Sequence, residues 1–200
     1  APSHLKILHE QEYKQGRFQV YNDKPDFPVI HCHQVHSSTV IEYQGEKTES
    51  IKADGLIIDP VKFPNQVLAI KTADCLPILL IGKKVALIHA GWKGLQNKIL
   101  QSKALHPLDI TDIYIGPSMQ NYEVTEEFKQ HFPDSNKFST RNNKLYFNLQ
   151  SEACRQLHES FPYAKITDSN ICTKANIEYN SYRRDKTNIR NWNIFKINKT

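Results

Sequence analysis

Short apolar runs alternate with polar, turn-rich segments along most of the chain. Runs rich in β-branched residues predict strands, and they occupy residues 29–35, 39–43, 55–59, 67–71, 77–81, 85–89, 112–116, 164–168 and 191–197. The runs between residues 67 and 89 are continuously apolar, which is typical of central strands covered on both faces. The polar segments 21–28 and 131–144 predict loops.

Helical periodicity is less frequent than strand-like patterning. It predicts helices over Gly94 to Leu105, Val124 to His131 and Leu149 to Ser160. Because several strands stand beside each helix, we expect one α/β domain over residues 1–200. Strand-to-helix connections are the places where such folds usually bind ligands.

Composition and charge narrow the class of protein. The chain is 39% hydrophobic and 24% charged, which is ordinary for a globular enzyme. Its net charge of +5 is spread among acidic residues, so we expect small anionic molecules as partners and no nucleic acid. No run approaches the roughly 18 to 20 apolar residues of a membrane span, and APSHLKILHE lacks a secretory-signal layout. We therefore expect no membrane association and a cytoplasmic protein.

The four cysteines are widely spaced and form no CxxC pair. That spacing fits a reducing compartment better than a disulfide-rich secreted scaffold. Nothing in the pattern indicates an oligomeric state.

Three metal-type side chains stand at the ends of predicted strands: His36, Cys75 and His89. Two imidazoles and one thiolate are typical zinc ligands, and three protein ligands are the composition of a catalytic site. Their separation along the chain requires three neighbouring strands to bring their ends to one point. A buried, inert cysteine and hydrogen-bonded core histidines are the alternative, which the spacing alone leaves open.

Several segments together resemble a known family. They are QVH (34–36), ADGLI (53–57), KTADCLPILL (71–80), HAGWKG (89–94), IGPSM (115–119), YEV (122–124), CT (172–173) and SYRRD (181–185). They resemble the laccase-domain family, once labelled multicopper polyphenol oxidases and now regarded as zinc-dependent purine nucleoside phosphorylases. The resemblance covers about residues 30 to 190. It implies a layered α/β/β/α sandwich with mixed sheets.

The resemblance also implies a reaction. The substrates would be phosphate and a purine nucleoside such as adenosine, inosine, guanosine or methylthioadenosine, in purine salvage. Deamination of adenosine by zinc-activated water would accompany it. The family's metal ligands fall on His36, Cys75 and His89, and the implied metal is zinc.

Asp74 and the HAGWKG segment carry further expectations. Asp74 is either a turn-capping carboxylate or a catalytic contact to the purine or to a metal ligand. Gly91 and Gly94 are expected to permit a tight turn, with Lys93 beside an anion site at the start of a helix. The family usually carries Arg in place of Lys93, so phosphate orientation is expected to be looser. Trp92 either stacks on a base or packs in the core.

SYRRD places two arginines in succession. Because consecutive residues of an extended chain point to opposite sides, we expect one arginine to face the substrate and the other to pair with a carboxylate. We favour Arg183 for the catalytic role and keep Arg184 as a candidate substrate-binding residue. The family's TGRM-like continuation reads TNIR here, and the preceding aromatic pair reads Tyr179-Asn180, which bears on substrate preference.

Three other functions use the same residues. Cys75 activated by His89 would make a metal-free acyl hydrolase or amidase. Copper would support phenol oxidation, but the extra histidine-rich sets that several copper atoms need are not found in the sequence. A binding protein with a structural zinc is disfavoured, because such a site normally closes with four ligands.

Overall fold

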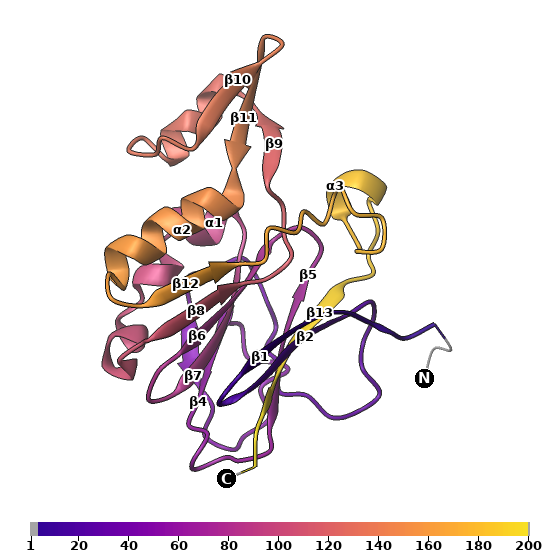
Figure 1. Ribbon diagram of the computed structural model, residues 1–200, viewed down its shortest axis with the longest axis vertical. Coiled ribbons are helices and arrows are strands. Elements are labelled where there is room, and N and C mark those ends of the chain that lie inside the picture. The colour runs from indigo at the N-terminus through magenta and orange to yellow at the C-terminus, as the bar shows by residue number, and fades with distance from the viewer. Residues whose placement is uncertain (1–3, 200) are drawn as a thin grey trace.

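A mixed six-stranded sheet carries the central strands (Figure 1). The structure is a computed structural model that describes residues 4–199; residues 1–3 and 200, which the expected domain of 1–200 included, lie outside it. The strand order is β12-β8-β6-β7-β4-β3. The bounds are β3 Val40–Glu42, β4 Gly55–Ile58, β6 Leu76–Ile81, β7 Val85–Ala90, β8 Asp112–Ile115 and β12 Lys165–Asp168. The pairs β3/β4 and β8/β12 are parallel, and the others are antiparallel.

Every residue of β6 and β7 is buried, as their continuous apolar sequences predict. Successive side chains of a strand point to opposite faces. Accordingly, Ile78 and Leu80 belong to the core beneath the helices, whereas Leu79 and Ile81 belong to the core shared with a second sheet. The sheet is therefore covered on both faces.

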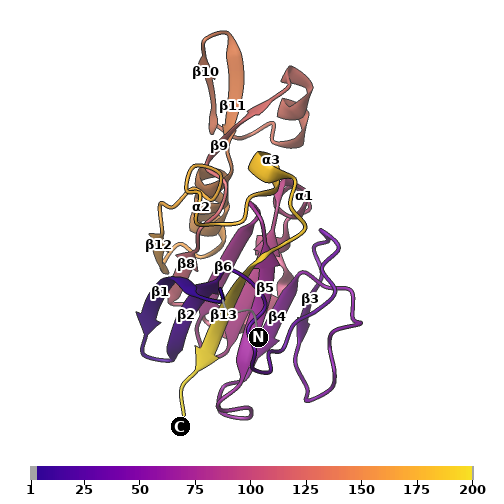
Figure 2. The same ribbon diagram turned by 90° about the vertical axis from the view of Figure 1, so that its right-hand side faces the viewer.

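The second sheet is antiparallel, with the order β1-β2-β13-β5. Its strands are β1 Ile7–Tyr13, β2 Gly16–Tyr21, β5 Val67–Thr72 and β13 Asn191–Ile197. It packs against the six-stranded sheet through Phe18 and Phe195, and Figure 2 shows the two sheets one in front of the other. The outer face carries Trp192, which packs with Phe27 and Val29 of an irregular segment. The expected layered α/β fold with mixed sheets is confirmed.

The helical layer is more broken than the sequence predicts. The expected helix over Gly94 to Leu105 is wrong: α1 spans only Trp92–Gln96, and two 3₁₀ turns follow, η1 Ile99–Gln101 and η2 Lys103–Leu108. Lys98 interrupts the helix because it adopts a left-handed conformation, with φ of 61°. In contrast, α2 Leu149–Ser160 has the predicted bounds, and Asn148 caps its first turn. No helix within residues 4–199 is long and apolar enough to cross a membrane.

A small antiparallel sheet projects beyond the two main sheets (Figure 1). It has the order β10-β11-β9, from β9 Asn121–Val124, β10 Phe138–Arg141 and β11 Lys144–Asn148. The predicted loop 131–144 is thus partly a strand, and the predicted helix Val124 to His131 is the 3₁₀ helix η3 Glu126–His131. The hairpin forms because Asn142 and Asn143 both accept positive φ, as a tight two-residue turn requires.

The predicted strand over residues 29–35 is wrong. This segment makes only isolated bridges, from Ile30 to Leu68 and from His33 to Lys52. It crosses from the edge of one sheet toward the other, so it cannot extend a ladder with either. The crossing brings residues 35–37 to the end of the six-stranded sheet at which β4 begins. One further helical turn, α3 Tyr182–Asp185, lies near the same end (Figure 1).

Candidate metal centre

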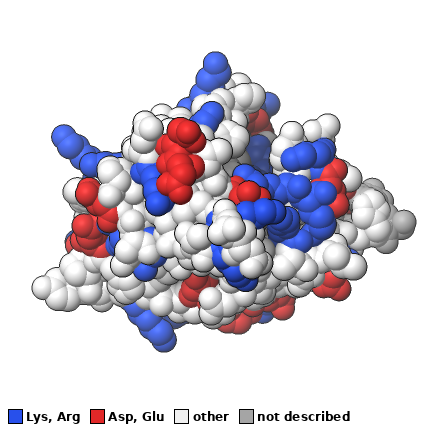
Figure 3. All heavy atoms as spheres, turned by 90° about the horizontal axis from the view of Figure 1, so that it is seen from above, with Lys and Arg blue, Asp and Glu red and all other residues white. Residues whose placement is uncertain are grey.

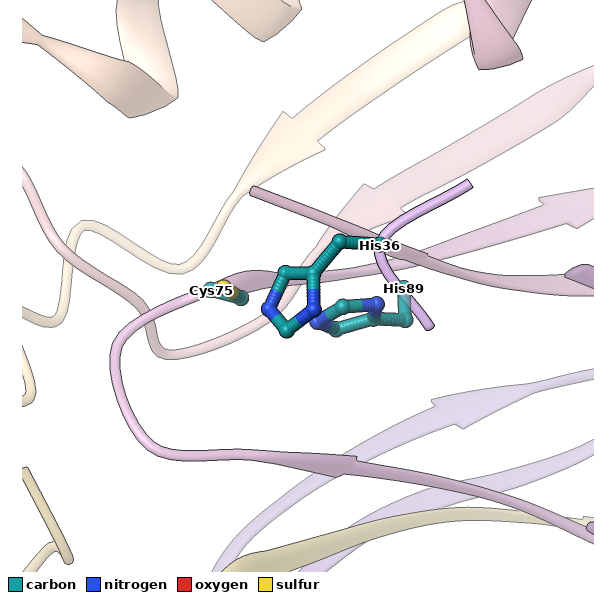
Figure 4. A group of neighbouring side chains, drawn as sticks. All are labelled: His36, Cys75 and His89. Atoms are coloured by element: carbon teal, nitrogen blue, oxygen red, sulfur yellow. The ribbon is translucent and has the colours of Figure 1, made fainter. Parts of the chain in front are cut away.

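The structure brings the three predicted ligands together. His36 lies on the crossing segment, Cys75 lies in the turn between β5 and β6, and His89 lies on β7. Their ligand atoms are all within 4.8 Å of one another, and the two imidazoles and the sulfur point toward a common place (Figure 4). Among residues 4–199, this is the one group of three or more such side chains with ligand atoms this close.

Charge favours the metal-binding form of the thiol. Burial acts to raise the pKa of Cys75, but the nearby charge of His89 and hydrogen bonds from both histidines outweigh it and lower that pKa. Burial likewise acts to lower the pKa of His89, and its contacts with Cys75 and Asp54 raise it. The thiolate is the form that binds metals, so this surrounding prepares Cys75 as a ligand.

Asp54 orients His89 through a contact to the ring nitrogen Nδ1. Its side chain is fully buried, and its Oδ2 lies 2.7 Å from Nδ1 of His89. With Nδ1 held there, Nε2 is the nitrogen left for a ligand. A carboxylate that fixes a histidine in this way is the usual second partner of a metal-bound imidazole.

The same carboxylate holds the segment that carries His36. It accepts hydrogen bonds from the backbone N–H groups of Val35 at 3.2 Å, His36 at 3.1 Å and Ser37 at 2.8 Å. His36 itself adopts φ of 62°, a conformation that needs such support. One buried carboxylate therefore positions two of the three ligands.

The donor set fits a zinc-class ion. Two imidazole nitrogens and a thiolate, backed by a buried carboxylate, match the ligands that zinc prefers, and copper accepts the same donors. Three ligands leave room for a substrate or water beside the ion.

Gly91 is needed for space and not for an unusual backbone conformation. Its φ of −91° and ψ of −168° are open to any residue. A Cβ at this position would lie 2.9 Å from Sγ of Cys75, whereas a Cβ at Gly94 would meet nothing closer than 3.6 Å. The expectation that both glycines permit the turn is therefore wrong: only Gly91 is constrained, and by the sulfur.

One cavity beside the triad is mostly apolar. We call it the apolar cavity; its volume is about 320 Å³, and it is lined by His36, Asp74, Cys75, Gly91, Trp92, Lys93, Met119, Tyr122, Leu149 and Arg183. Trp92 forms part of its wall and also packs against Phe128 and His131, while stacking on a base stays a prediction. A flat wall of this kind suits a flat aromatic ligand.

Lys93 lies on the rim of the apolar cavity. Its Nζ sits 5.7 Å from the centre of the Trp92 ring. The helix that it belongs to has only five residues. Few peptide dipoles add up over one turn, so the expected anion site at this helix start has little support.

A second cavity at the triad is lined by more basic and polar side chains. We call it the basic cavity; its volume is about 600 Å³, and it is lined by His33, Gln34, His36, Lys71, Thr72, Ala73, Asp74, Cys75, His89, Tyr182, Arg183 and Arg190. Both cavities share His36, Asp74, Cys75 and Arg183 as wall residues. The candidate metal centre therefore lies where the two cavities meet.

Asp74 is engaged in a network of its own. Its carboxylate accepts hydrogen bonds from Thr173 Oγ1 at 2.7 Å, Ser181 Oγ at 3.0 Å and the Arg183 backbone N–H at 2.8 Å. Its φ of 107° is rare for a residue with a side chain. These contacts support the turn-anchoring interpretation and place α3 next to the triad.

The two arginines separate as expected, although they do so on a helical turn and not on an extended segment. The Arg183 guanidinium stacks 4.4 Å above the Tyr122 ring and faces both cavities. Arg184 lies outside the lining of both cavities and donates to the backbone carbonyls of Thr173 at 2.9 Å and Tyr179 at 2.6 Å. It also pairs with Asp185 at 2.9 Å.

Sequence reasoning missed four residues at this site: Asp54, Lys71, Tyr122 and Arg190. All four stand inside quoted segments, which was the one available signal: ADGLI, KTADCLPILL, YEV and TNIR. A metal-bound histidine needs a partner for its second nitrogen, but only strand pairing shows that Asp54 lies beside His89.

Comparison with known proteins agrees with this geometry. The family model described as multi-copper polyphenol oxidoreductase laccase matches residues 14–195. A purine nucleoside phosphorylase of Aquifex aeolicus is 38% identical over 163 residues, covering 77% of this chain and 75% of the relative. The Escherichia coli purine nucleoside phosphorylase YfiH is 32% identical over 194 residues, covering 90% and 77%.

Solved structures show the same fold. YlmD from Geobacillus stearothermophilus superposes with a TM-score of 0.71 at 25% identity, over 85% of this chain and 73% of that one. A Bacillus licheniformis hypothetical protein, YfiH, gives a TM-score of 0.71 at 23% identity, over 84% and 73%.

Proposed function

Because the chain belongs to the multi-copper polyphenol oxidoreductase laccase family, and relatives of it are named purine nucleoside phosphorylases, we propose that it cleaves purine nucleosides with phosphate. The observation that carries the proposal is the place of the His36–Cys75–His89 group at the junction of two cavities of different character. Two substrates can then meet at one centre, one from each cavity.

The proposed reaction exchanges one bond at the ribose. An oxygen of the phosphate dianion HPO₄²⁻ forms a bond to C1′ as the bond from C1′ to the purine nitrogen breaks. The electron pair of that bond stays on the purine nitrogen, and the proton that the phosphate carried ends there. The products are the free base and ribose 1-phosphate, or the methylthio form from methylthioadenosine.

The apolar cavity suits the nucleoside. Tyr122 and Trp92 offer flat ring surfaces, while Met119 and Leu149 supply apolar contact. Arg183, which lies on the wall shared by both cavities, supplies positive charge between base and phosphate. Holding both substrates in line lowers the entropic part of the barrier.

The metal would be zinc, held by His36, Cys75 and His89, and when bound it would supply Lewis-acid charge for an oxyanion at the ribose. Asp54 fixes the tautomer of His89 and the backbone of His36. Asp74 holds the Arg183 backbone through its N–H group, which positions that cation. We assign Asp54 and Asp74 to positioning and Arg183 to direct contact with substrate.

Hydrolysis by two carboxylates receives no support from the cavity walls. Most glycosidases activate water with one carboxylate and protonate the leaving group with another. Asp74 is the one carboxylate that lines either cavity in the described part of the chain, and it already accepts three hydrogen bonds.

Two alternatives use the same site. Oxidation of phenols by several copper atoms needs further ligand sets, and residues 4–199 contain only this one group of three. A metal-free hydrolase with Cys75 as nucleophile uses the same thiolate and imidazole. Adenosine deamination stays a prediction, which release of ammonia would test.

Product analysis with and without phosphate tests the proposal. The zinc-loaded protein is incubated with adenosine, inosine or methylthioadenosine, and chelator-treated protein is the control. Free base and ribose 1-phosphate should appear only with phosphate. Free ribose at the same rate without phosphate would make the protein a hydrolase. Ammonia without free base would leave deamination as the one activity still supported. If neither product appears with zinc bound, the Cys75 hydrolase takes first place.

A further inference from the structure

The basic cavity contains cations without ion-pair partners. Lys71, Arg183 and Arg190 line it, and within residues 4–199 none of the three lies within 4.0 Å of a carboxylate oxygen. Lys and Arg side chains gather on the surface above α3, the end at which the cavity lies (Figure 3). Unpaired cations in a concave site attract and hold anions.

Lys71 is anchored but keeps donor capacity. Its Nζ lies 3.0 Å from the backbone oxygen of Cys32 and 3.2 Å from Nδ1 of His31. An ammonium group has three hydrogens, so one remains for a ligand. The two contacts hold the charge in place, and Lys71, on β5, lines the basic cavity.

Arg190 has more hydrogen-bond donors left unused than Lys71. Only its Nη1 is used, donating to the backbone oxygens of Thr187 at 2.9 Å and Ile189 at 3.4 Å. Nε and Nη2 therefore keep their hydrogens, and a guanidinium edge of this kind matches two phosphate oxygens. The guanidinium also sits 6.0 Å from the Tyr182 ring, which limits its freedom.

The apolar cavity offers phosphate much less. Apart from the shared Arg183, its one cation is Lys93, which lies over the Trp92 ring. A small, highly charged ion is expected to choose the wall that carries more cations without ion-pair partners.

We propose that inorganic phosphate binds in the basic cavity, where Lys71 and Arg190 hold it and Arg183 faces it from the shared wall. This inference rests on the proposed phosphorolysis and moves the phosphate away from Lys93, where the sequence placed it. Phosphate and nucleoside then enter from two separate cavities and meet at C1′.

Binding of inorganic phosphate to the zinc-loaded protein tests the site without turnover. Titration calorimetry should show phosphate binding that weakens about 10- to 100-fold in Arg190→Gln and in Lys71→Met, because each removes a charged hydrogen bond. Arg141→Gln, which removes a cation from the distant strand β10, is the matched control and should bind phosphate normally. In turnover, the two cavity variants should raise the KM for phosphate and leave that for nucleoside close to wild type.

Several outcomes overturn the proposal while leaving phosphorolysis intact. One is normal phosphate binding in both Arg190→Gln and Lys71→Met. Another is loss of phosphate binding in Lys93→Met alone, which would return the ion to the apolar cavity. A third is binding of adenosine 5′-monophosphate, but not of free phosphate, that is lost in Arg190→Gln and Lys71→Met, while free phosphate still binds elsewhere on the protein. Failure of wild-type protein to form ribose 1-phosphate would instead refute the proposed function.

Discussion

Oδ2 of Asp54 lies 2.7 Å from Nδ1 of His89, and the two side chains are 0% and 3% exposed. Burial acts to raise the pKa of Asp54, but hydrogen bonds from His89 and Ser37 outweigh it and hold that pKa far below its usual range. The carboxylate is therefore a permanent anion behind the candidate ligand. The pair links the core of the six-stranded sheet to the metal centre.

Asp54→Asn should weaken metal binding about 10- to 100-fold, because the amide carries no charge to fix and polarise His89. Competition with a chromophoric zinc chelator measures the affinity. Asp59→Asn, which alters a loop carboxylate bonded to the Val61 backbone N–H, is the control. Equal zinc affinity in Asp54→Asn and wild type would remove the positioning role.

Gly91→Ala should disturb the metal centre, and Gly94→Ala should not. A methyl group at position 91 would lie 2.9 Å from the Cys75 sulfur, but one at position 94 would make ordinary contacts from 3.6 Å. Elemental analysis should show zinc reduced in the first variant and unchanged in the second. Full zinc in both variants would mean that the turn relaxes at little cost.

Glu152→Gln should make the free energy of unfolding less dependent on pH at acidic pH. Burial acts to raise the pKa of Glu152, but hydrogen bonds from Arg155, Ser135 and Gln156 outweigh it and lower that pKa. Since the folded pKa is lowered, the stabilisation is complete above the ordinary value of 4.5 and is lost as pH falls through the lower folded value.

Urea unfolding at pH 7 and near pH 3 measures this effect. Glu152→Gln should cost about 2 kcal/mol of unfolding free energy at pH 7 and less at low pH. The matched control is Glu159→Gln, whose 70% exposed carboxylate lies 3.5 Å from the same arginine. It should change stability by less than about 0.5 kcal/mol. A constant difference between wild type and Glu152→Gln at both pH values would contradict the assignment.

Replacing Arg184 should lower the stability of the protein, whereas replacing Arg183 should lower its activity. Arg184→Met removes donors from the backbone carbonyls of Thr173 and Tyr179, so we expect it to lose about 2 to 4 kcal/mol of unfolding free energy. Arg183→Met removes only a stack on Tyr122 and should fold with near-normal stability while losing phosphorolysis. Thermal unfolding and the product assay, run on both variants, give the comparison. The reverse pattern would exchange their roles.

Local patterns were sufficient for the strands of the central sheet and for α2. The apolar runs of β6 and β7 are buried in full, and α2 begins at Leu149 and ends at Ser160, as predicted. The hairpin of β10 and β11 was missed because β10 is mostly polar and exposed and because β11 follows a polar, turn-rich segment. Residues 29–35 look like a strand but bridge first to Leu68 of β5 and then to Lys52, outside any strand, which no local pattern shows.

The metal ligands of the site could be predicted from the sequence, but the residues that position them and line the cavities could not. Ligand chemistry and placement at the ends of predicted strands indicate His36, Cys75 and His89, and the family resemblance puts the metal ligands on the same three residues. The roles of Asp54 and Arg190 depend on distances between segments far apart in the chain, which only the folded structure supplies.

Cys75 lies in the connection from β5, in the four-stranded sheet, to β6, in the six-stranded sheet, whereas His89 belongs to the six-stranded sheet alone. An ion bound to both, and to His36, therefore acts as a cross-link that closes chain loops across the two layers. By mass action, free zinc at a hundred times its Kd would add about 2.7 kcal/mol to the free energy of unfolding. Amide hydrogen exchange should accordingly slow around the metal centre when zinc is added. The ion that serves the proposed reaction would then also hold the two sheets together.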